Sequence, residues 1–272
     1  MFYSSNERTP PSSMYVSVGS LNNAADNPNV YEVLNTMPHP AYSPDTLAND
    51  IAIITYDPVG ADSIPCAKIY SSDVTDNLPV MTAGWGATSN IAGSNSDVLL
   101  SVPLQISSLK ICSNLYPLWK SNNGSLICTA VVNGQDTCFG DSGGPLVFSG
   151  VSPMPIIGLT SFGVNLSSDP MSGVKHQCGS SNGTGYYTHI INYIDWIVSS
   201  TKLNKDSLIY MEQPANGSLN YPYGYAAFSS SKSVENSTKN SSTSFAAKSS
   251  KICLLYHFIS QAALVLSIMY LY

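Results

Sequence analysis

The hydrophobic residues of this chain come in short runs. Up to about residue 200, Gly, Pro, Asn or Ser interrupts each run before it reaches the length of an ordinary helix. Short apolar runs separated by turn residues predict many strands joined by tight turns. Because no long helix could connect parallel strands, we expect antiparallel pairing in a barrel or sandwich. The strand candidates are residues 16–18, 51–54, 80–83, 98–106 and 156–159. One helix is predicted at residues 188–199, where apolar residues recur at helical spacing.

Composition limits the classes of function. Of the 272 residues 43% are hydrophobic, enough for a sizeable core in one large domain or two small ones, and only 10% are charged. The net charge of −6 offers no positive surface for phosphates, so we expect no nucleic-acid partner. Sparse charge, 17 Tyr and long Ser and Asn tracts are typical of secreted or surface proteins. The chain contains no cofactor motif and no dense carboxylate loop, so neither a cofactor nor a metal ion is expected.

The composition changes after residue 200 and divides the chain into three predicted segments. They are a folded domain at 1–200, a Ser/Thr/Asn-rich disordered stalk at 201–251, and a hydrophobic segment at 252–272. Within 229–250, 12 of 22 residues are Ser or Thr, which leaves too few apolar side chains for a core. The last 21 residues contain no Asp, Glu, Lys or Arg and are long enough to span a bilayer.

Two kinds of membrane attachment fit this hydrophobic segment. A transmembrane anchor usually has basic residues on its cytoplasmic side, and no basic residue follows this segment. A small-residue site, a polar spacer and an apolar end, by contrast, form the signal for a glycolipid (GPI) anchor. Ser241 or Ser242 is a candidate attachment site. A retained tail anchor and an assembly artefact are the alternatives. We therefore expect an extracellular protein attached to the cell surface, with the membrane as a partner of the tail.

Six glycosylation sequons agree with export. They begin at Asn123, Asn165, Asn182, Asn216, Asn236 and Asn240. Residues 1–11, however, lack the apolar core of a signal peptide. Either the chain is not exported or its true start lies upstream.

Residues 136–146, Asp-Thr-Cys-Phe-Gly-Asp-Ser-Gly-Gly-Pro-Leu, carry the chemistry of the chain. A serine with glycines on both sides allows close backbone approach and leaves amide N–H groups to stabilise an oxyanion. Residues 140–144 also fit the G-x-S-x-G elbow of α/β-hydrolases, which needs a helix directly after the serine. Here an extended run follows that begins with Pro145, so this alternative fails.

Four further segments appear in the order found in one enzyme family. They are residues 48–54, 82–86, 112–128 and 187–197. Together with residues 136–146 they make the chain, over roughly residues 13–200, similar to the chymotrypsin-like (trypsin) serine endopeptidases. The resemblance implies an all-β fold of two packed antiparallel β-barrels, the first incomplete, with a short carboxyl-terminal helix. It implies proteolysis by Ser-His-Asp acyl-enzyme chemistry.

The resemblance assigns catalytic roles residue by residue. Ser142 matches the nucleophile, and the N–H groups of Gly140 and Ser142 match the oxyanion hole. Asp50 matches the aspartate that orients the general-base histidine, although Asn-Asp before an apolar run is also an ordinary turn. Asp141 matches the zymogen-switch carboxylate, which pairs with the family's new amino terminus.

The resemblance also assigns a specificity pocket. Asp136, six residues before Ser142, matches the carboxylate that selects Arg or Lys, although such a residue alone is often a turn aspartate. Ser161 and Gly163 match the edge that pairs with the substrate backbone, and Gly163 and Gly185 match the glycines that keep the pocket open. Phe162 replaces the family's usual Trp. The expected partners are proteins or peptides with Arg or Lys at the cleavage site, and protein inhibitors.

Six cysteines allow 15 pairings in principle. The resemblance implies the disulfides Cys112–Cys128 and Cys138–Cys178. Cys66 matches a position whose partner in many relatives lies outside the catalytic domain. The segment between Gly163 and Cys178 is longer than usual, so it either borders the substrate cleft or is a harmless surface loop.

The histidines fall outside the family's Ala-Ala-His-Cys setting. They are His39, His176, His189 and His257. Matching residues 15–20 to the family places Met1 just after the catalytic histidine, so we expect the general base upstream of this sequence. The same truncation predicts that Asp141, without its ammonium partner, turns outward and leaves the oxyanion hole badly formed.

Two interpretations remain open. The first is an amino-terminally clipped copy of an active, surface-tethered protease, nearly inert as written because a triad member is absent. The second is a pseudoprotease, a non-catalytic surface module that uses the scaffold for binding. The conjunction of Ser142, Asp50, Asp136 and Asp141 favours the first.

Overall fold

The computed structural model describes residues 3–4, 7–24, 30–56, 66–91, 94–166, 177–211 and 263–265, with the side chains of 3–4, 7–8 and 263–265 left out of the account. Strands predominate among these residues. They are β1 (Tyr3–Ser4), β2 (Glu7–Arg8), β3 (Tyr15–Ser17), β4 (Val30–Pro38), β5 (Ala52–Tyr56), β6 (Ile69–Tyr70), β7 (Pro79–Gly84), β8 (Leu100–Ile106), β9 (Leu126–Ala130), β10 (Pro145–Phe148), β11 (Ile156–Asn165), β12 (Gly183–His189), β13 (Ile209–Tyr210) and β14 (Ala263–Val265). The helical segments are η1 (Pro11–Ser13), α1 (Lys110–Leu115), η3 (Ile190–Tyr193), α2 (Ile194–Thr201) and α3 (Lys205–Leu208).

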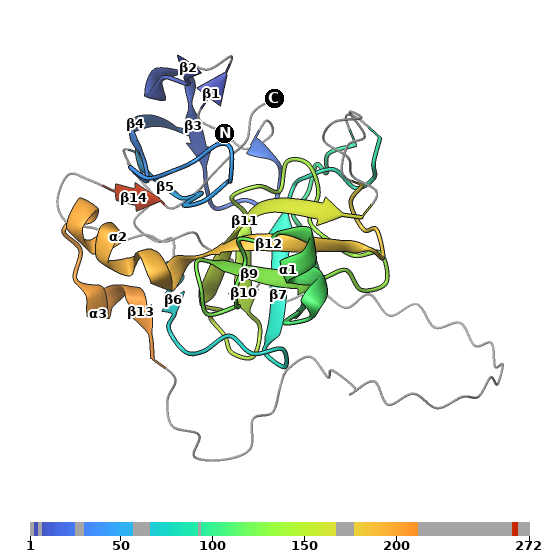
Figure 1. Ribbon diagram of the computed structural model, residues 1–272. Coiled ribbons are helices and arrows are strands. Elements are labelled where there is room, and N and C mark those ends of the chain that lie inside the picture. The colour runs from blue at the N-terminus through green and yellow to red at the C-terminus, as the bar shows by residue number, and fades with distance from the viewer. Residues whose placement is uncertain are drawn as a thin grey trace, which may run out of the picture.

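Six strands close into an antiparallel barrel (Figure 1). Their order is β10, β7, β8, β9, β12 and β11, and β11 pairs again with β10 to complete the ring. Closure leaves these strands without a free sheet edge. Buried side chains from several strands fill the barrel, among them Val80, Leu104, Ile127, Leu146 and Ile157. The predicted antiparallel barrel is therefore confirmed.

Strands β3, β4 and β5 form a sheet with β14 in the order β14, β5, β4, β3, and this sheet is open among the described residues. β5 is buried on both faces, because Ile53 packs toward α2 whereas Ala52, Ile54 and Tyr56 pack toward β3 and β4. This alternation with a period of two explains why residues 51–54 form an unbroken apolar run. The open sheet agrees with the expectation that the first barrel is incomplete.

The predicted carboxyl-terminal helix forms as η3 followed by α2. Ile190, Ile194 and Ile197 are buried in the core cluster that they share with Ile53 of β5. The helix thereby fills the space between the open sheet and the closed barrel. Its apolar spacing was a reliable sequence signal because one face is buried.

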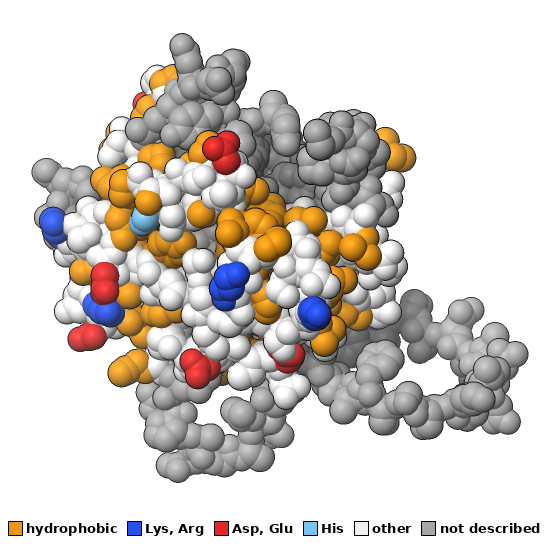
Figure 2. Space-filling model, viewed as in Figure 1, with side chains coloured by type: hydrophobic (Ala, Val, Ile, Leu, Met, Phe, Trp, Pro, Cys, Tyr) orange, Lys and Arg blue, Asp and Glu red, His pale blue; other side chains and the backbone are white. Residues whose placement is uncertain are grey.

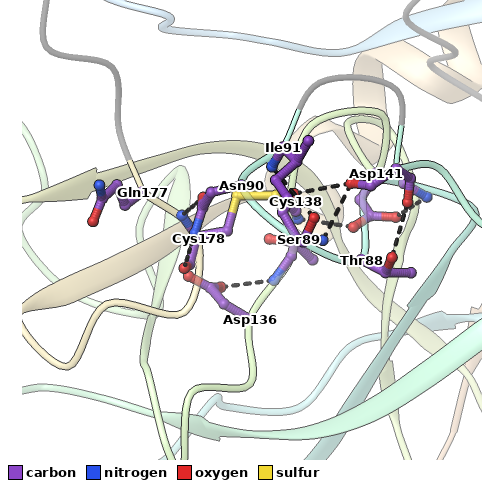
Figure 3. The surroundings of a disulfide bond; sticks show 12 residues. Thr88, Ser89, Asn90, Ile91, Asp136, Cys138, Asp141, Gln177 and Cys178 are labelled. Carbon is purple, nitrogen blue, oxygen red and sulfur yellow. Dashed lines mark hydrogen bonds between the residues drawn. A yellow bond between two sulfur atoms is a disulfide. The ribbon is translucent and has the colours of Figure 1, made fainter.

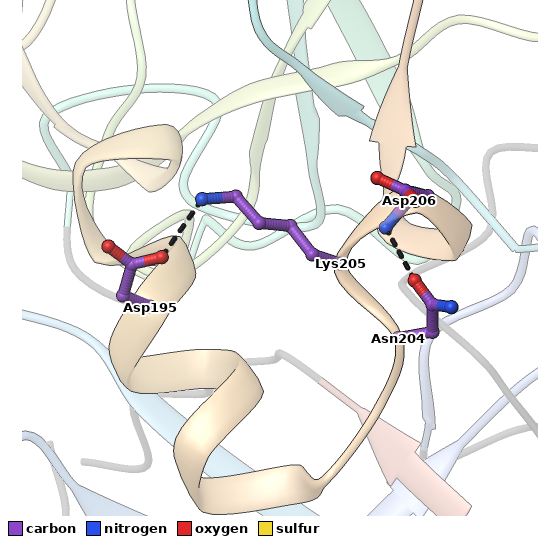
Figure 4. Close-up of polar contacts among 4 residues, drawn as sticks. All are labelled: Asp195, Asn204, Lys205 and Asp206. Atoms are coloured by element: carbon purple, nitrogen blue, oxygen red, sulfur yellow. Dashed lines mark hydrogen bonds and ion pairs between the residues drawn. The ribbon is translucent and has the colours of Figure 1, made fainter.

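The folded unit continues past the predicted boundary at residue 200. Leu203 and Leu208 are buried in the same core, and β13 pairs with β6. An ion pair between Lys205 and Asp195 joins α3 to α2 (Figure 4), at 2.9 Å and largely exposed. Because exposed ion pairs contribute little stability, the two leucines hold this segment in place.

Several predicted features fall outside the described residues. They include 212–262 and 266–272 of the stalk and tail, 167–176 of the long segment before Cys178, and the sequons at Asn216, Asn236 and Asn240. Three tail residues are described, as strand β14, which pairs antiparallel with β5. Within the described part of the chain, every helix is too short or too polar to cross a bilayer. Figure 2 shows one face, on which charged side chains lie scattered among uncharged ones.

Candidate active site

The closed barrel fixes the position of Asp50, which lies two residues before the start of β5. The residue is 8% exposed, and Ser161 Oγ donates a hydrogen bond to its Oδ2 at 2.7 Å. Thr188 Oγ1 donates to the carbonyl oxygen of Asp50 at 2.8 Å. Ser161 and Thr188 lie on the neighbouring strands β11 and β12, so the barrel holds both the backbone and the carboxylate of Asp50.

A β-bulge places the Ser161 hydroxyl. Thr160 pairs with Tyr187 and Phe162 pairs with Tyr186, so Ser161 is the extra residue of β11. A bulge changes the direction of a side chain relative to the regular alternation of a strand. The sequence placed Ser161 only at the edge of the specificity pocket, and its contact with Asp50 was missed.

The loop that carries Ser142 is attached to the same part of β11. Gly143 N donates to Thr160 O at 2.7 Å, and Thr160 N donates to Gly144 O at 2.9 Å. These bonds lie next to Ser161, whose hydroxyl contacts Asp50. The structure therefore brings Ser142 and Asp50 to one region of β11. Strand β10 begins at Pro145, directly after this loop, so the alternative of an elbow followed by a helix is excluded.

The backbone around Ser142 depends on glycine. Gly140 and Gly143 have φ angles of +96° and +81°, which L side chains rarely adopt. Among the hydrogen bonds of the described residues, the amides of Gly140 and Ser142 donate to no acceptor. Two backbone donors next to Ser142 are therefore unpaired among the described residues.

Asp141 points inward, so the expectation that it turns outward was wrong. Its Oδ1 accepts a hydrogen bond from Gly86 N and its Oδ2 one from Cys138 N, both at 2.8 Å. A Cβ added to Gly84 or Gly86 would lie 2.0 or 2.5 Å from Asp141 Oδ1. Burial raises the pKa of Asp141, and the two amides counteract that rise. Backbone donors thus hold the carboxylate in place, which the sequence argument had left out.

Asp136 lies close to the Cys138–Cys178 disulfide (Figure 3). Thr137 N donates to Asp136 Oδ1 at 2.8 Å, whereas Oδ2 is buried and has no hydrogen-bond partner of normal geometry among the described residues. Burial raises the pKa of Asp136 to about 6, against the opposing effect of the Thr137 and Gly179 amides. The site thus holds a buried carboxylate that the amides of Thr137 and Gly179 approach, but whose Oδ2 makes no hydrogen bond of normal geometry with the described residues.

The pocket glycines lie beside this carboxylate. A Cβ added to Gly185 would lie 3.3 Å from Asp136 Oδ1. Gly163 pairs with Gly185 across strands β11 and β12. The structure thus places Gly185 next to Asp136 and Gly163 beside Gly185.

Both expected disulfides, Cys112–Cys128 and Cys138–Cys178, are confirmed. The second joins the segment before Ser142 to the segment before β12.

The aromatic residue Phe162 is well packed, because the centroid of its ring lies 4.8 Å from that of Tyr186 in a stacked arrangement.

Neither described histidine contacts Asp50. The His39 ring packs edge-on against Tyr193 and Trp196, and His189 Nδ1 lies 3.1 Å from Gly124 O. Burial lowers the pKa of both imidazoles. His176 and His257 lie outside the described residues. In the described ranges, no group of His, Cys, Asp and Glu side chains is arranged to hold a metal ion.

A closed antiparallel barrel with a glycine-flanked serine in the loop before β10, and a buried aspartate hydrogen-bonded to β11, is the arrangement of the chymotrypsin-like serine proteases. The trypsin family model matches residues 4–197, which is most of the chain. The chain therefore belongs to the trypsin family.

Three relatives illustrate the range of the similarity. The chain is 30% identical over 186 residues to CLIP domain-containing serine protease B4 of Anopheles gambiae, covering 64% of this chain and 47% of that protein. It is 29% identical over 198 residues to trypsin I-P1 of Gallus gallus, covering 71% and 73%. It is 34% identical over 163 residues to kallikrein-4 of Homo sapiens, covering 58% and 56%.

Proposed function

We propose that this protein is a serine endopeptidase in which Ser142 forms the acyl-enzyme. The supporting observation is that the loop after Ser142 and the Asp50 carboxylate are both hydrogen-bonded to β11 at Thr160 and Ser161. In the reaction, Ser142 Oγ attacks the scissile carbonyl carbon and passes its proton to an imidazole. The imidazole then gives that proton to the leaving amine as the C–N bond breaks. Water afterwards hydrolyses the ester and restores the Ser142 hydroxyl.

The proposed specificity is for Arg or Lys on the acyl side of the cleaved bond. The support is the Asp136 Oδ2 atom, which is buried without a donor of normal geometry among the described residues. A buried carboxylate oxygen left in this state is costly, and a guanidinium or ammonium group would compensate it. Gly163 and Gly185 leave the space through which such a side chain would pass.

The mechanism also needs a general base beside Asp50. Neither His39 nor His189 contacts Asp50, so the proposal requires an imidazole from outside the described residues. The same observation favours a second candidate function, a non-catalytic surface module that binds protein segments in the protease cleft.

Labelling with a fluorophosphonate, with imidazole added as the general base, separates these two functions. We expect covalent attachment to Ser142 Oγ, with loss of fluoride, because the free Gly140 and Ser142 amides stabilise the phosphoryl oxygen. Peptide mass spectrometry would identify the labelled residue, and Ser142→Ala and heat-unfolded protein serve as controls. Absence of labelling on the folded protein would contradict the enzyme and favour the binding module.

We also propose that the protein is glycosylated, extracellular and attached to the membrane through its carboxyl-terminal segment. The hydrophobic composition of residues 252–272 and the two disulfides support this location. The sequons differ in access. Asn165 is 2% exposed and its Nδ2 donates to Gln177 O at 3.3 Å, whereas Asn182 lies exposed on the turn before β12.

Peptide mapping of protein made in eukaryotic cells tests this location. We expect a glycan on Asn182, none on Asn165, and no peptide from 252–272 in the mature, lipid-anchored form. Asn182→Gln should remove one glycan and leave the fold intact. An occupied Asn165 in folded protein would contradict its buried position, and an intact Tyr272 would rule out the glycolipid anchor.

A further inference from the structure

The side chain of Asn90 holds the backbone of Cys178 (Figure 3). Cys178 N donates to Asn90 Oδ1 at 2.8 Å, and Asn90 Nδ2 donates to Cys178 O at 3.3 Å. The two residues are 88 positions apart in the sequence. An amide side chain that engages both polar groups of one residue restrains it in position and in orientation.

Asn90 belongs to a loop that is itself anchored beside the proposed active site. Ala87 N donates to Phe139 O at 2.7 Å, and Ala87 and Asn95 form an isolated β-bridge. Thr88 N and Thr88 Oγ1 both donate to Ser94 O, each at 2.9 Å. The Asn90 side chain therefore extends from a turn that is held by these hydrogen bonds.

The Cys178 backbone leads directly to the carboxylate of the pocket. The following residue, Gly179, has an amide that lowers the pKa of Asp136. Gly179 has φ +70°, and an added Cβ would lie 2.4 Å from Gly134 O, so this segment is closely packed. Asn90, Cys178, Gly179 and Asp136 line one cavity of about 410 Å³.

We propose that Asn90 is a positioning residue for the specificity pocket. By holding Cys178, it keeps the Gly179 amide beside Asp136 and thereby fixes the carboxylate that would receive the substrate cation. This inference rests on the proposed function, since it assumes that the Asp136 pocket binds a cationic side chain.

Benzamidine, an aromatic amidinium, is a suitable probe because its binding requires no catalysis. We expect Asn90→Ala to raise the Kd of benzamidine by about tenfold, the effect of losing two ordinary hydrogen bonds. Titration calorimetry gives the Kd, and a thermal melt shows whether the variant is folded. Ser89→Ala, the neighbouring substitution in the same loop, should leave the Kd within about twofold.

A second readout is independent of the pocket ligand. Asn90→Ala should increase the rate at which dithiothreitol reduces Cys138–Cys178, because Cys178 is less restrained, while Cys112–Cys128 keeps its rate as an internal control. Mass spectrometry of alkylated peptides measures both rates. If Asn90→Ala does not fold, Asn90→Asp, which keeps the acceptor for Cys178 N and loses the donor, is measured in the same two ways.

The outcomes separate the two proposals. If the unchanged protein fails to bind benzamidine, the cation pocket of the proposed function is refuted, and the reduction rates still decide the role of Asn90. An unaltered Kd together with an unaltered ratio of reduction rates would overturn the positioning role, whatever happens to the melting temperature.

Discussion

Asp136→Ser is expected to weaken the binding of benzamidine by at least about 30-fold. The amidinium loses its only proposed anionic partner, and truncating one side of a buried, hydrogen-bonded charge pair costs about 2–5 kcal/mol. The Oδ2 oxygen of Asp136 is buried and has no donor of normal geometry among the described residues, so the bound cation would replace no internal partner. Titration calorimetry at pH 8 measures the difference.

The pH dependence gives the same prediction an independent signature. Burial raises the pKa of Asp136 to about 6, and a cation binds the ionised carboxylate. Affinity should therefore be constant well above pH 6 and fall about tenfold per pH unit below it, since the carboxyl must first lose its proton. Asp195→Asn, a change at an exposed carboxylate, is the matched control. If the Kd of benzamidine changes neither with Asp136→Ser nor with pH, the assignment of the pocket is contradicted.

The parts of the site that the sequence predicted are those coded within short segments. The glycines around Ser142 permit backbone angles that L side chains rarely adopt, and the apolar run after Asp50 marks a strand buried on both faces. The antiparallel strands, in a barrel or a sandwich, and the carboxyl-terminal helix followed from the short apolar runs and the helical periodicity, and the family resemblance then implied the barrel. Such signals survive in the sequence because a single local conformation requires them.

The parts that were missed depend on contacts between distant residues. Ser161 meets Asp50 across 111 positions and Thr188 meets Asp50 across 138, and neither residue stands out from an ordinary strand serine or threonine. The inward Asp141 was missed for a related reason, because its partners are backbone amides, which every residue carries. The folded unit extends past residue 200 because Leu203 and Leu208 pack in the core. The sequence did not indicate this packing, since the neighbouring Lys and Asn residues make the segment look polar.

The second large effect concerns the general base. We expect added imidazole to accelerate the hydrolysis of an arginine ester by this chain by about 100-fold or more, the usual contribution of general-base catalysis. Asp50, held by Ser161, would accept the imidazole N–H and leave the other ring nitrogen directed at the Ser142 hydroxyl. Because only the neutral ring accepts that proton, the acceleration should decline as the pH falls and the added imidazole becomes protonated.

Two variants decide what the imidazole is doing. Ser142→Ala should reduce the rate to that of imidazole in solution, because the acyl acceptor is lost. Asp50→Asn should keep the shape of the site and lose most of the acceleration, since a neutral amide no longer stabilises the imidazolium. Equal rates in the unchanged chain and in Ser142→Ala would mean that Ser142 does not act as the nucleophile. The same free amides and buried carboxylate would then serve only to bind a peptide, and the cleft would be a recognition site.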